Sequence, residues 1–202
     1  MERRRFRWKP ALLRQAWEVE VDATGITKLG TKGWRIAFAD VTRLAFTRET
    51  LRGTLFRRLQ IHAGGRRYQL GINTGTLGYR SDPDAQAHFA MIRAIAAGLA
   101  SAVPEVPVDL GRQGGARWAM FLVGLLGVLA SVGFVAAAAS LRRGGLSVEA
   151  GLPILLLSLI GGLYAWSNRP WTQPPRIVAA DFPARLDILA QTGPGSETDL
   201  PD

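Results

Sequence analysis

Cysteine is absent from this 202-residue chain, and several classes of chemistry are absent with it. Without cysteine there is no disulfide, no thiolate metal ligand and no thiol nucleophile, as expected of a chain that folds in a reducing compartment. The HExxH, GxSxG and GxxxxGK[ST] signatures are missing too, and His, Asp and Glu show no metal-ligand spacing. We therefore predict a protein that is not an enzyme and that uses neither a metal nor a cofactor.

The N-terminal segment lacks the apolar core of a signal peptide, since only three apolar residues (11–13) precede Arg14. It has aromatic residues among basic ones instead: Phe6 and Trp8 stand between Arg3, Arg4, Arg5, Arg7 and Lys9. Such a tail can lie on an anionic bilayer, where each Lys or Arg contributes ~1 kcal/mol. For residues 1–13 we expect either this lipid contact or a solvated, disordered tail.

Basic charge is concentrated in the first part of the chain. The whole chain carries +9, whereas residues 1–117 hold 20 Lys and Arg against 10 Asp and Glu, a balance of +10. Such a surplus suits nucleic acid or anionic lipid. Nucleic acid is the weaker interpretation, because the outer strand faces lack aromatic stacking positions.

Two apolar runs organise the rest. Residues 118–141 contain no charge and exceed the ~20 helical residues that cross a bilayer, and residues 150–167 reach the short end of that range. The sequence predicts a transmembrane helical hairpin. Arginines flank its open end (Arg112, Arg117, Arg169, Arg176 and Arg185), against Arg142 and Arg143 in its turn. This bias and the missing leader favour a bacterial inner-membrane protein with both termini in the cytoplasm.

Small residues recur at helical spacing within both runs. The predicted packing or docking positions are Gly124, Gly127, Ser131, Ser158 and Gly162, and Ala165 extends the second stripe. Small residues let helices approach closely in lipid, so these stripes can join the two spans or dock a partner protein.

The first hundred residues alternate with period two and then change to helical spacing. We expect strands around Trp17–Val21, Ile26–Leu29, Trp34–Phe38 and Val41–Thr47, and a hairpin turning at Gly64-Gly65 that pairs Ile61 with Tyr68 and His62 with Arg67. Arg58 and Arg67 would then share an outer, electropositive face with His62. A helix capped by Asp82 should begin at Pro83 and be stopped by Pro104, with His88 as a packing or edge residue.

Strands followed by one amphipathic helix form the element order of a pleckstrin-homology (PH) domain. AWEVEVDATGITKLGTKGWRIAFADVTRLAF resembles the bacterial PH and GRAM-like domains of membrane proteins, and the resemblance covers about residues 14–103. It implies an α+β fold, an antiparallel bent sheet or barrel with a capping helix, and a binding or scaffold role. Phosphoinositide-binding members carry basic residues in the first strand loop. Here that loop, residues 22–25, has none, and Lys28, Lys32 and Arg35 are the nearest substitutes.

We therefore expect a basic tail (1–13), a PH-like domain (14–103), a linker (104–117), a hairpin (118–167) and a cytoplasmic tail (168–202). The predicted function is a membrane-anchored binding or scaffold module for a protein partner or anionic phospholipid headgroups. The alternative is an accessory subunit of a larger membrane enzyme or transporter, docked through the hairpin.

Overall fold

The structure, a computed structural model, describes residues 2–111, 115–140, 148–169, 171 and 175–191. It divides into two compact units, one formed by Met1–Gly111 with Pro175–Asp202 and the other by Arg112–Pro174. The second unit is thus an insertion within the first, which we call the domain.

A four-stranded antiparallel meander opens the domain. Its strands are β1 (Arg4–Trp8), β2 (Trp17–Val21), β3 (Gly25–Lys28) and β4 (Trp34–Ala37), followed by the short 3₁₀ helix η1 (Phe38–Asp40). The predicted inward positions are confirmed, because Val19, Val21, Ile26 and Ile36 are buried. Glu20, expected on the outer face, is only 8% exposed as well, where it pairs with Arg3 and Arg5.

The expectation of a basic tail over residues 1–13 is wrong for its central part, which forms β1. Phe6 pairs with Val19, and Trp8 pairs with Trp17. Trp8 is fully buried, and its indole Nε1–H donates to the carbonyl of Gly71 at 3.1 Å. The reason is that Phe6 and Trp8 alternate with arginine, so a strand buries both aromatic rings on one face.

The second sheet has the strand order β7-β6-β5-β8-β9. Its strands are β5 (Val41–Leu51), β6 (Thr54–Ala63), β7 (Arg66–Gly75), β8 (Pro107–Leu110) and β9 (Arg176–Val178). The register predicted around Gly64-Gly65 is confirmed, with Ile61 opposite Tyr68 and His62 opposite Arg67. The sheet is mixed rather than antiparallel throughout, because β8 pairs parallel with β5.

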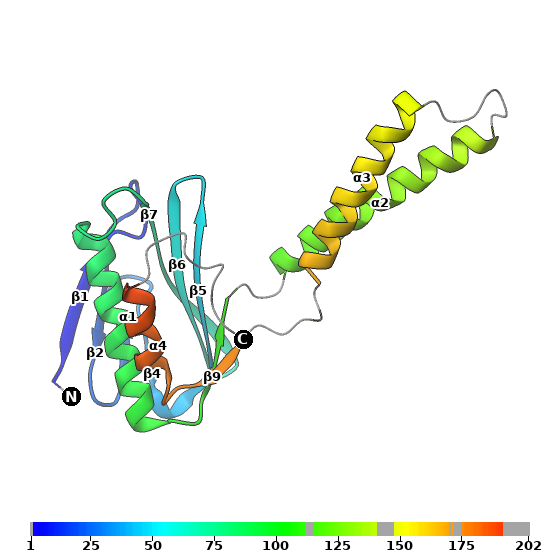
Figure 1. Cartoon of the computed structure of the whole chain (residues 1–202). Helices are drawn as coiled ribbons and strands as arrows, with labels where there is room; N and C mark the ends of the chain where they lie inside the picture. Colours follow the sequence, from blue (N-terminus) through cyan, green and yellow to red (C-terminus); the bar gives the residue numbers. More distant parts are fainter. Residues whose placement is uncertain (1, 112–114, 141–147, 170, 172–174, 192–202) are drawn as a thin grey trace. The chain divides into compact units, whose positions relative to one another are not determined.

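Two helices pack on the domain (Figure 1). Helix α1 (Pro83–Ala102) begins as predicted, with the Asp82 side chain accepting from the backbone N–H groups of Asp84 and Ala85. It contacts β1, β2, β3, β7, η1 and the later helix α4 (Phe182–Gln191). His88 is fully buried, which fits the packing role expected of it.

The domain is larger than residues 14–103. Pro107–Leu110, expected within a linker, forms β8, whose Val108 and Asp109 are fully buried. Part of the expected cytoplasmic tail returns as β9 and α4, and Phe182 and Leu186 are fully buried. The residues of α4 do carry a short helical stripe, with Phe182, Leu186 and Leu189 on one side after Pro183, but the expected domain did not include this helix.

The inserted unit contains α2 (Gly115–Ser140) and α3 (Val148–Ser167), which pack against each other. Among the described residues, one helical stretch, Trp118–Ala138, is long and apolar enough to cross a membrane; the apolar stretch Gly151–Ser167 is shorter. The sheets and helices together confirm the α+β class. By length and composition, the described residues contain one clear membrane-spanning candidate and not the expected two.

Some residues on which the sequence interpretation relied lie outside the described part of the chain. They are Arg112, Arg142, Arg143 and residues 192–202.

Candidate functional site: an arginine-lined cavity

Most of the N-terminal arginines proposed for lipid contact form ion pairs with carboxylates of β2. Arg3 and Arg5 form ion pairs with Glu20, at 3.4 and 2.6 Å, and Arg7 lies 3.7 Å from Glu18. The hydrogen bonds with Glu20 raise the pKa of Arg5. Arg4 is exposed on the same edge strand, and the backbone N–H of Lys9 donates to Asp84.

Two of the three substitutes for the PH headgroup site already have partners within the domain. Lys28 lies over the ring of Trp17, 4.0 Å from its centroid, and burial followed by the charge of Lys32 lowers the pKa of Lys28. Arg35 pairs with Asp22 at 3.5 Å and donates to the Thr24 hydroxyl at 2.9 Å. Arg35 is therefore engaged by a carboxylate and Lys28 by an aromatic ring.

Arg58 and Arg67 lie exposed on β6 and β7 of the other sheet. The ten residues proposed for headgroup binding are thus distributed over two sheets, and they do not form one site.

Several of the predicted packing positions of the hairpin do lie at the contact between α2 and α3. A Cβ on Gly124 would lie 2.5 Å from the backbone nitrogen of Ala165, and one on Gly127 would lie 3.5 Å from Cα of Gly161. Ser131 is buried and Ser158 is half-buried. The prediction of Gly162 as a packing position is wrong, because a Cβ there would meet no atom within 4 Å. Its neighbour Gly161 makes the close contact instead.

A cavity of about 520 Å³ lies elsewhere in the domain, where five segments meet. Phe46 and Arg48 come from β5, Arg57 from β6, Tyr79 and Arg80 from the loop before α1, and the remaining residues from α1 and α4; these are Ala85, Gln86, Phe89, Leu189, Ala190 and Gln191. The volume lies in the range of small-molecule sites. We call it the arginine cavity.

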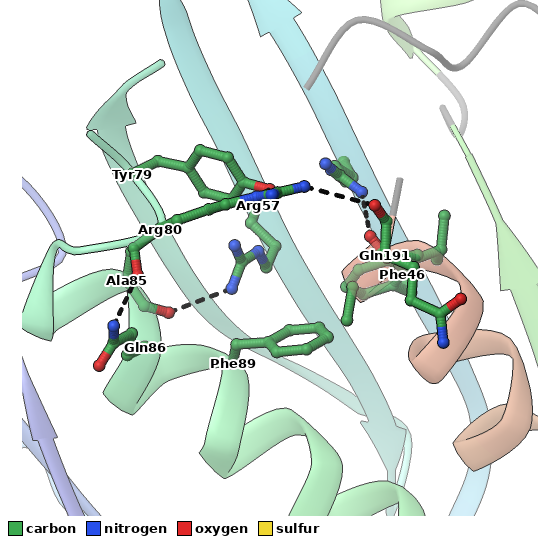
Figure 2. Close-up of a pocket in the computed structure, with 11 residues that line it drawn as sticks. Phe46, Arg57, Tyr79, Arg80, Ala85, Gln86, Phe89 and Gln191 are labelled. Carbon is green, nitrogen blue, oxygen red and sulfur yellow. Dashed lines mark hydrogen bonds between the residues drawn. The ribbon is translucent and has the colours of Figure 1, made fainter. Parts of the chain in front are cut away.

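Arg57 is the central group of this cavity, and Figure 2 shows its side chain directed toward those of Tyr79 and Phe89. Arg57 is only 5% exposed. It donates to the carbonyl of Ala85 at 3.2 Å, and its guanidinium carbon lies 4.8 Å from the centroid of the Phe89 ring. Within the described part of the chain no carboxylate forms an ion pair with it. A buried cation without an anionic partner is costly.

A second arginine increases the cost. In the ladder between β5 and β6, Arg48 stands directly opposite Arg57, and like charges in such positions repel. Burial first and Arg48 second lower the pKa of Arg57 to about 10, so Arg57 remains charged at neutral pH. The cavity therefore holds the buried, charged guanidinium of Arg57 beside apolar walls.

Helix α4 forms one wall, and the arginines hold its C-terminal end. Arg48 donates to the carbonyl of Leu189 at 2.7 Å, and Arg80 donates to that of Gln191 at 3.3 Å (Figure 2). Arginine donors commonly satisfy the last carbonyls of a helix. Gln86 donates to the carbonyl of Arg80 at 2.6 Å, which fixes the loop carrying Tyr79 and Arg80.

The chemistry of this site is the recognition of an anion. Guanidinium groups bind carboxylate and phosphate oxygens through paired hydrogen bonds, and Phe46, Phe89 and Leu189 offer an apolar surface beside them. The described residues hold no group of three or more His, Cys, Asp or Glu that could bind a metal ion.

The sequence contained a signal for Arg57 that our interpretation missed. In β6, Leu55, Leu59 and Ile61 are buried, and Arg57 shares their parity. An arginine in the inward register of a strand predicts a buried cation, whereas we had selected its outward neighbour Arg58. The contributions of Arg48, Arg80 and α4 depend on tertiary contacts.

No protein-family model matches the chain, and its comparison with curated proteins gives no significant match.

Proposed function

We propose that the chain is a membrane-anchored binding module, whose PH-like domain holds an anionic group of its ligand in the arginine cavity. The observation that carries the proposal is Arg57, a buried cation with no carboxylate partner among the described residues, facing a cavity of ligand size. A carboxylate or phosphate there would compensate the charge of Arg57.

The element order supports the PH-like interpretation. A four-stranded meander, three further antiparallel strands and helix α1 follow one another over residues 4–102. The resemblance does not extend to β8, β9 or α4, and α4 contributes one wall of the arginine cavity.

Membrane anchoring is supported by the apolar composition of α2 and by the aromatic side chains at the open end of the hairpin. The stretch Trp118–Ala138 has a mean hydropathy of 2.4, and 11% of its most apolar window is buried. Aromatic side chains gather near the open end of the hairpin, where Phe121 lies 6.0 Å from Trp118 and 5.5 Å from Trp171, as in interfacial belts.

Two crossings are proposed because both ends of the insertion belong to one domain. Strands β8 and β9 pair directly, so a chain that crosses a bilayer in α2 must cross back before β9. The stretch Gly151–Ser167 rises ~26 Å, close to the thickness of a thin bilayer. With the arginines flanking the open end, we place the domain on the cytoplasmic side of a bacterial inner membrane.

Docking to a larger membrane complex is the less supported alternative. Gly124, Gly127 and Gly161 already serve the contact between α2 and α3. The hairpin therefore has a use for its small residues within a single copy.

The anion site is tested with the full chain in nanodiscs of neutral phosphatidylcholine, titrated by calorimetry with pyrophosphate, citrate and short-chain phosphatidylglycerol. The first two probes report free anions and the third reports a lipid headgroup. We expect saturable binding of at least one probe, weakened ~10- to 100-fold by Arg57→Gln, as for the loss of charged hydrogen bonds.

Arg58→Gln is the matched control, because it makes the same charge change one residue away on the exposed face. It should retain wild-type affinity. Absence of binding by all three probes at millimolar concentration, or equal weakening by both substitutions, contradicts the proposed site.

A further inference from the structure

Three loops meet at one end of the domain, at the N-terminal end of α1 (Figure 1). They are residues 9–16 between β1 and β2, 52–53 between the end of β5 at Leu51 and β6, and 76–82 before α1. The backbone N–H of Asn73 donates to the carbonyl of Pro10 at 2.9 Å, and that of Thr76 donates to the carbonyl of Gly53 at 2.8 Å. Lys9 donates from its backbone to Asp84 at 3.0 Å, which ties the first loop to α1.

These loops expose leucines to an unusual extent. Leu12 is 95% exposed, Leu13 98% and Leu77 98%, and Leu51 at the edge of the β5–β6 turn is 56% exposed. In the described part of the domain, the remaining exposed large apolar side chain is Ile188. Single exposed leucines are ordinary, but four from three separate segments at one end form a patch. We call it the leucine end.

Basic residues lie close to these leucines in the chain. Lys9, Arg14, Arg52 and Arg80 are all exposed and lie on the same loops. The carboxylates nearby have structural partners, because Asp82 caps α1 and bonds to Thr74, and Asp84 accepts from Lys9. Leucines surrounded by cations suit the interface of an anionic bilayer, where apolar side chains enter the acyl region and cations meet headgroups.

The direction of the chain agrees with this assignment. Strand β8 runs parallel to β5, which ends at Leu51, and it leaves the sheet at Leu110 opposite Phe46. Within the domain, β8 therefore points in the same direction as β5, which leads to the β5–β6 turn.

We propose that the leucine end inserts into the headgroup and acyl boundary of a bilayer that contains anionic phospholipid. This rests on the membrane anchoring of the proposed function and does not depend on the arginine cavity. The leucine end would then orient the domain on the bilayer.

Because the chain has no cysteine, single-cysteine variants report one position each. Leu12→Cys and Leu77→Cys are labelled with an environment-sensitive fluorophore in the full chain, in nanodiscs containing phosphatidylglycerol and a doxyl-labelled lipid quencher. Arg66→Cys, at the β6–β7 turn, is the matched control: it is exposed, and the ten residues of β6 place it ~33 Å from the β5–β6 turn. We expect at least threefold stronger quenching at positions 12 and 77 than at 66, and less quenching in neutral nanodiscs.

A fourth label at Val132, exposed on α2, separates the two proposals. Quenching at 132 with positions 12 and 77 no more quenched than 66 overturns the insertion of the leucine end and leaves the anchoring intact. Absence of quenching at 132 overturns the anchoring itself.

Discussion

The backbone N–H of Leu110 donates to the carbonyl of Pro175 at 2.8 Å, so the two ends of the apolar insertion meet at neighbouring strands. Beside this bond, Asp109 of β8 is fully buried and receives hydrogen bonds from Arg43 of β5 and Arg176 of β9, the latter at 2.9 Å. One carboxylate thus joins three strands and attaches the returning chain to the domain.

Asp109→Asn should loosen β9 and α4 more than the rest of the domain. Burial raises the pKa of Asp109, but the hydrogen bonds from Arg176 and Arg43 outweigh it and leave the pKa below its usual value. The contribution of the carboxylate is therefore present above pH ~4 and is lost as the pH falls through the lowered pKa. We expect a loss of about 2–3 kcal/mol at pH 7, since the arginines are half exposed.

Hydrogen exchange followed by mass spectrometry measures this, with faster exchange expected in Phe182–Gln191. Asp187→Asn is the control, because its ion pair with Arg93 is half exposed on both sides and should contribute at most about 1 kcal/mol. Equal effects of the two substitutions would contradict the role assigned to Asp109.

Arg57→Met should remove anion binding without destabilising the domain. Replacing a buried, uncompensated cation by an apolar side chain of similar length is often neutral or stabilising. The substitution removes a single hydrogen bond, which Arg57 donates to the neutral carbonyl of Ala85. We expect a free energy of unfolding within about 1 kcal/mol of wild type, or higher, in urea titrations of the full chain in nanodiscs. A loss of several kcal/mol would instead show that Arg57 is a structural group.

His88 should remain neutral wherever the domain is folded. Burial first and the charge of Arg57 second lower its pKa to about 3. Because the unfolded chain takes up the proton near pH 6.5, the free energy of unfolding should fall as the pH drops from 6.5 toward 3, by about 2 kcal/mol at pH 5 relative to pH 7.

NMR titration measures this directly, since the chain has two histidines. His62→Gln assigns the spectrum; burial, and then the charges of Arg43 and Arg67, lower the pKa of His62. His88→Gln should flatten the pH dependence of unfolding. A His88 resonance that titrates above pH 6 in the folded protein would contradict the burial described here.

The contact between α2 and α3 should depend on Gly124 and not on Gly162. A Cβ on Gly124 would meet the backbone nitrogen of Ala165 at 2.5 Å, whereas one on Gly162 meets no atom within 4 Å. Gly124→Val should therefore separate the helices and lower the thermal stability of the hairpin, and Gly162→Val should not. Distances between spin labels on the two helices distinguish these outcomes; similar distances in both variants would exclude close packing at Gly124.

Local patterns predicted much of the domain. The Gly64-Gly65 register and the Asp82 cap followed from turn and capping chemistry, which depends on neighbouring residues alone. Strand β8, with only four residues between prolines and glycines, carried too little pattern to be recognised. Its parallel pairing with β5 arises only in three dimensions.

The arginine cavity illustrates the same division. Arg57 has the parity of the buried residues of β6, so its burial was predictable from the strand. The charge count instead directed attention to the N-terminal arginines in and beside β1. Three of them form ion pairs with Glu18 or Glu20 of β2. Which cations have a partner is a property of strand register, and composition alone does not contain it.

The central claim is that the insertion leaves the domain and returns to it on the same side of a bilayer. Labelling of single cysteines with a membrane-impermeant maleimide, in sealed vesicles of known orientation, tests this most directly. The positions are Arg66 at the start of β7, Asp181 before α4 and Ser140 at the end of α2, all exposed. We predict that Arg66→Cys and Asp181→Cys react from the same side and Ser140→Cys from the opposite side. Reaction of all three from one side would contradict a membrane-crossing hairpin, and reaction of positions 66 and 181 from opposite sides would contradict the discontinuous domain.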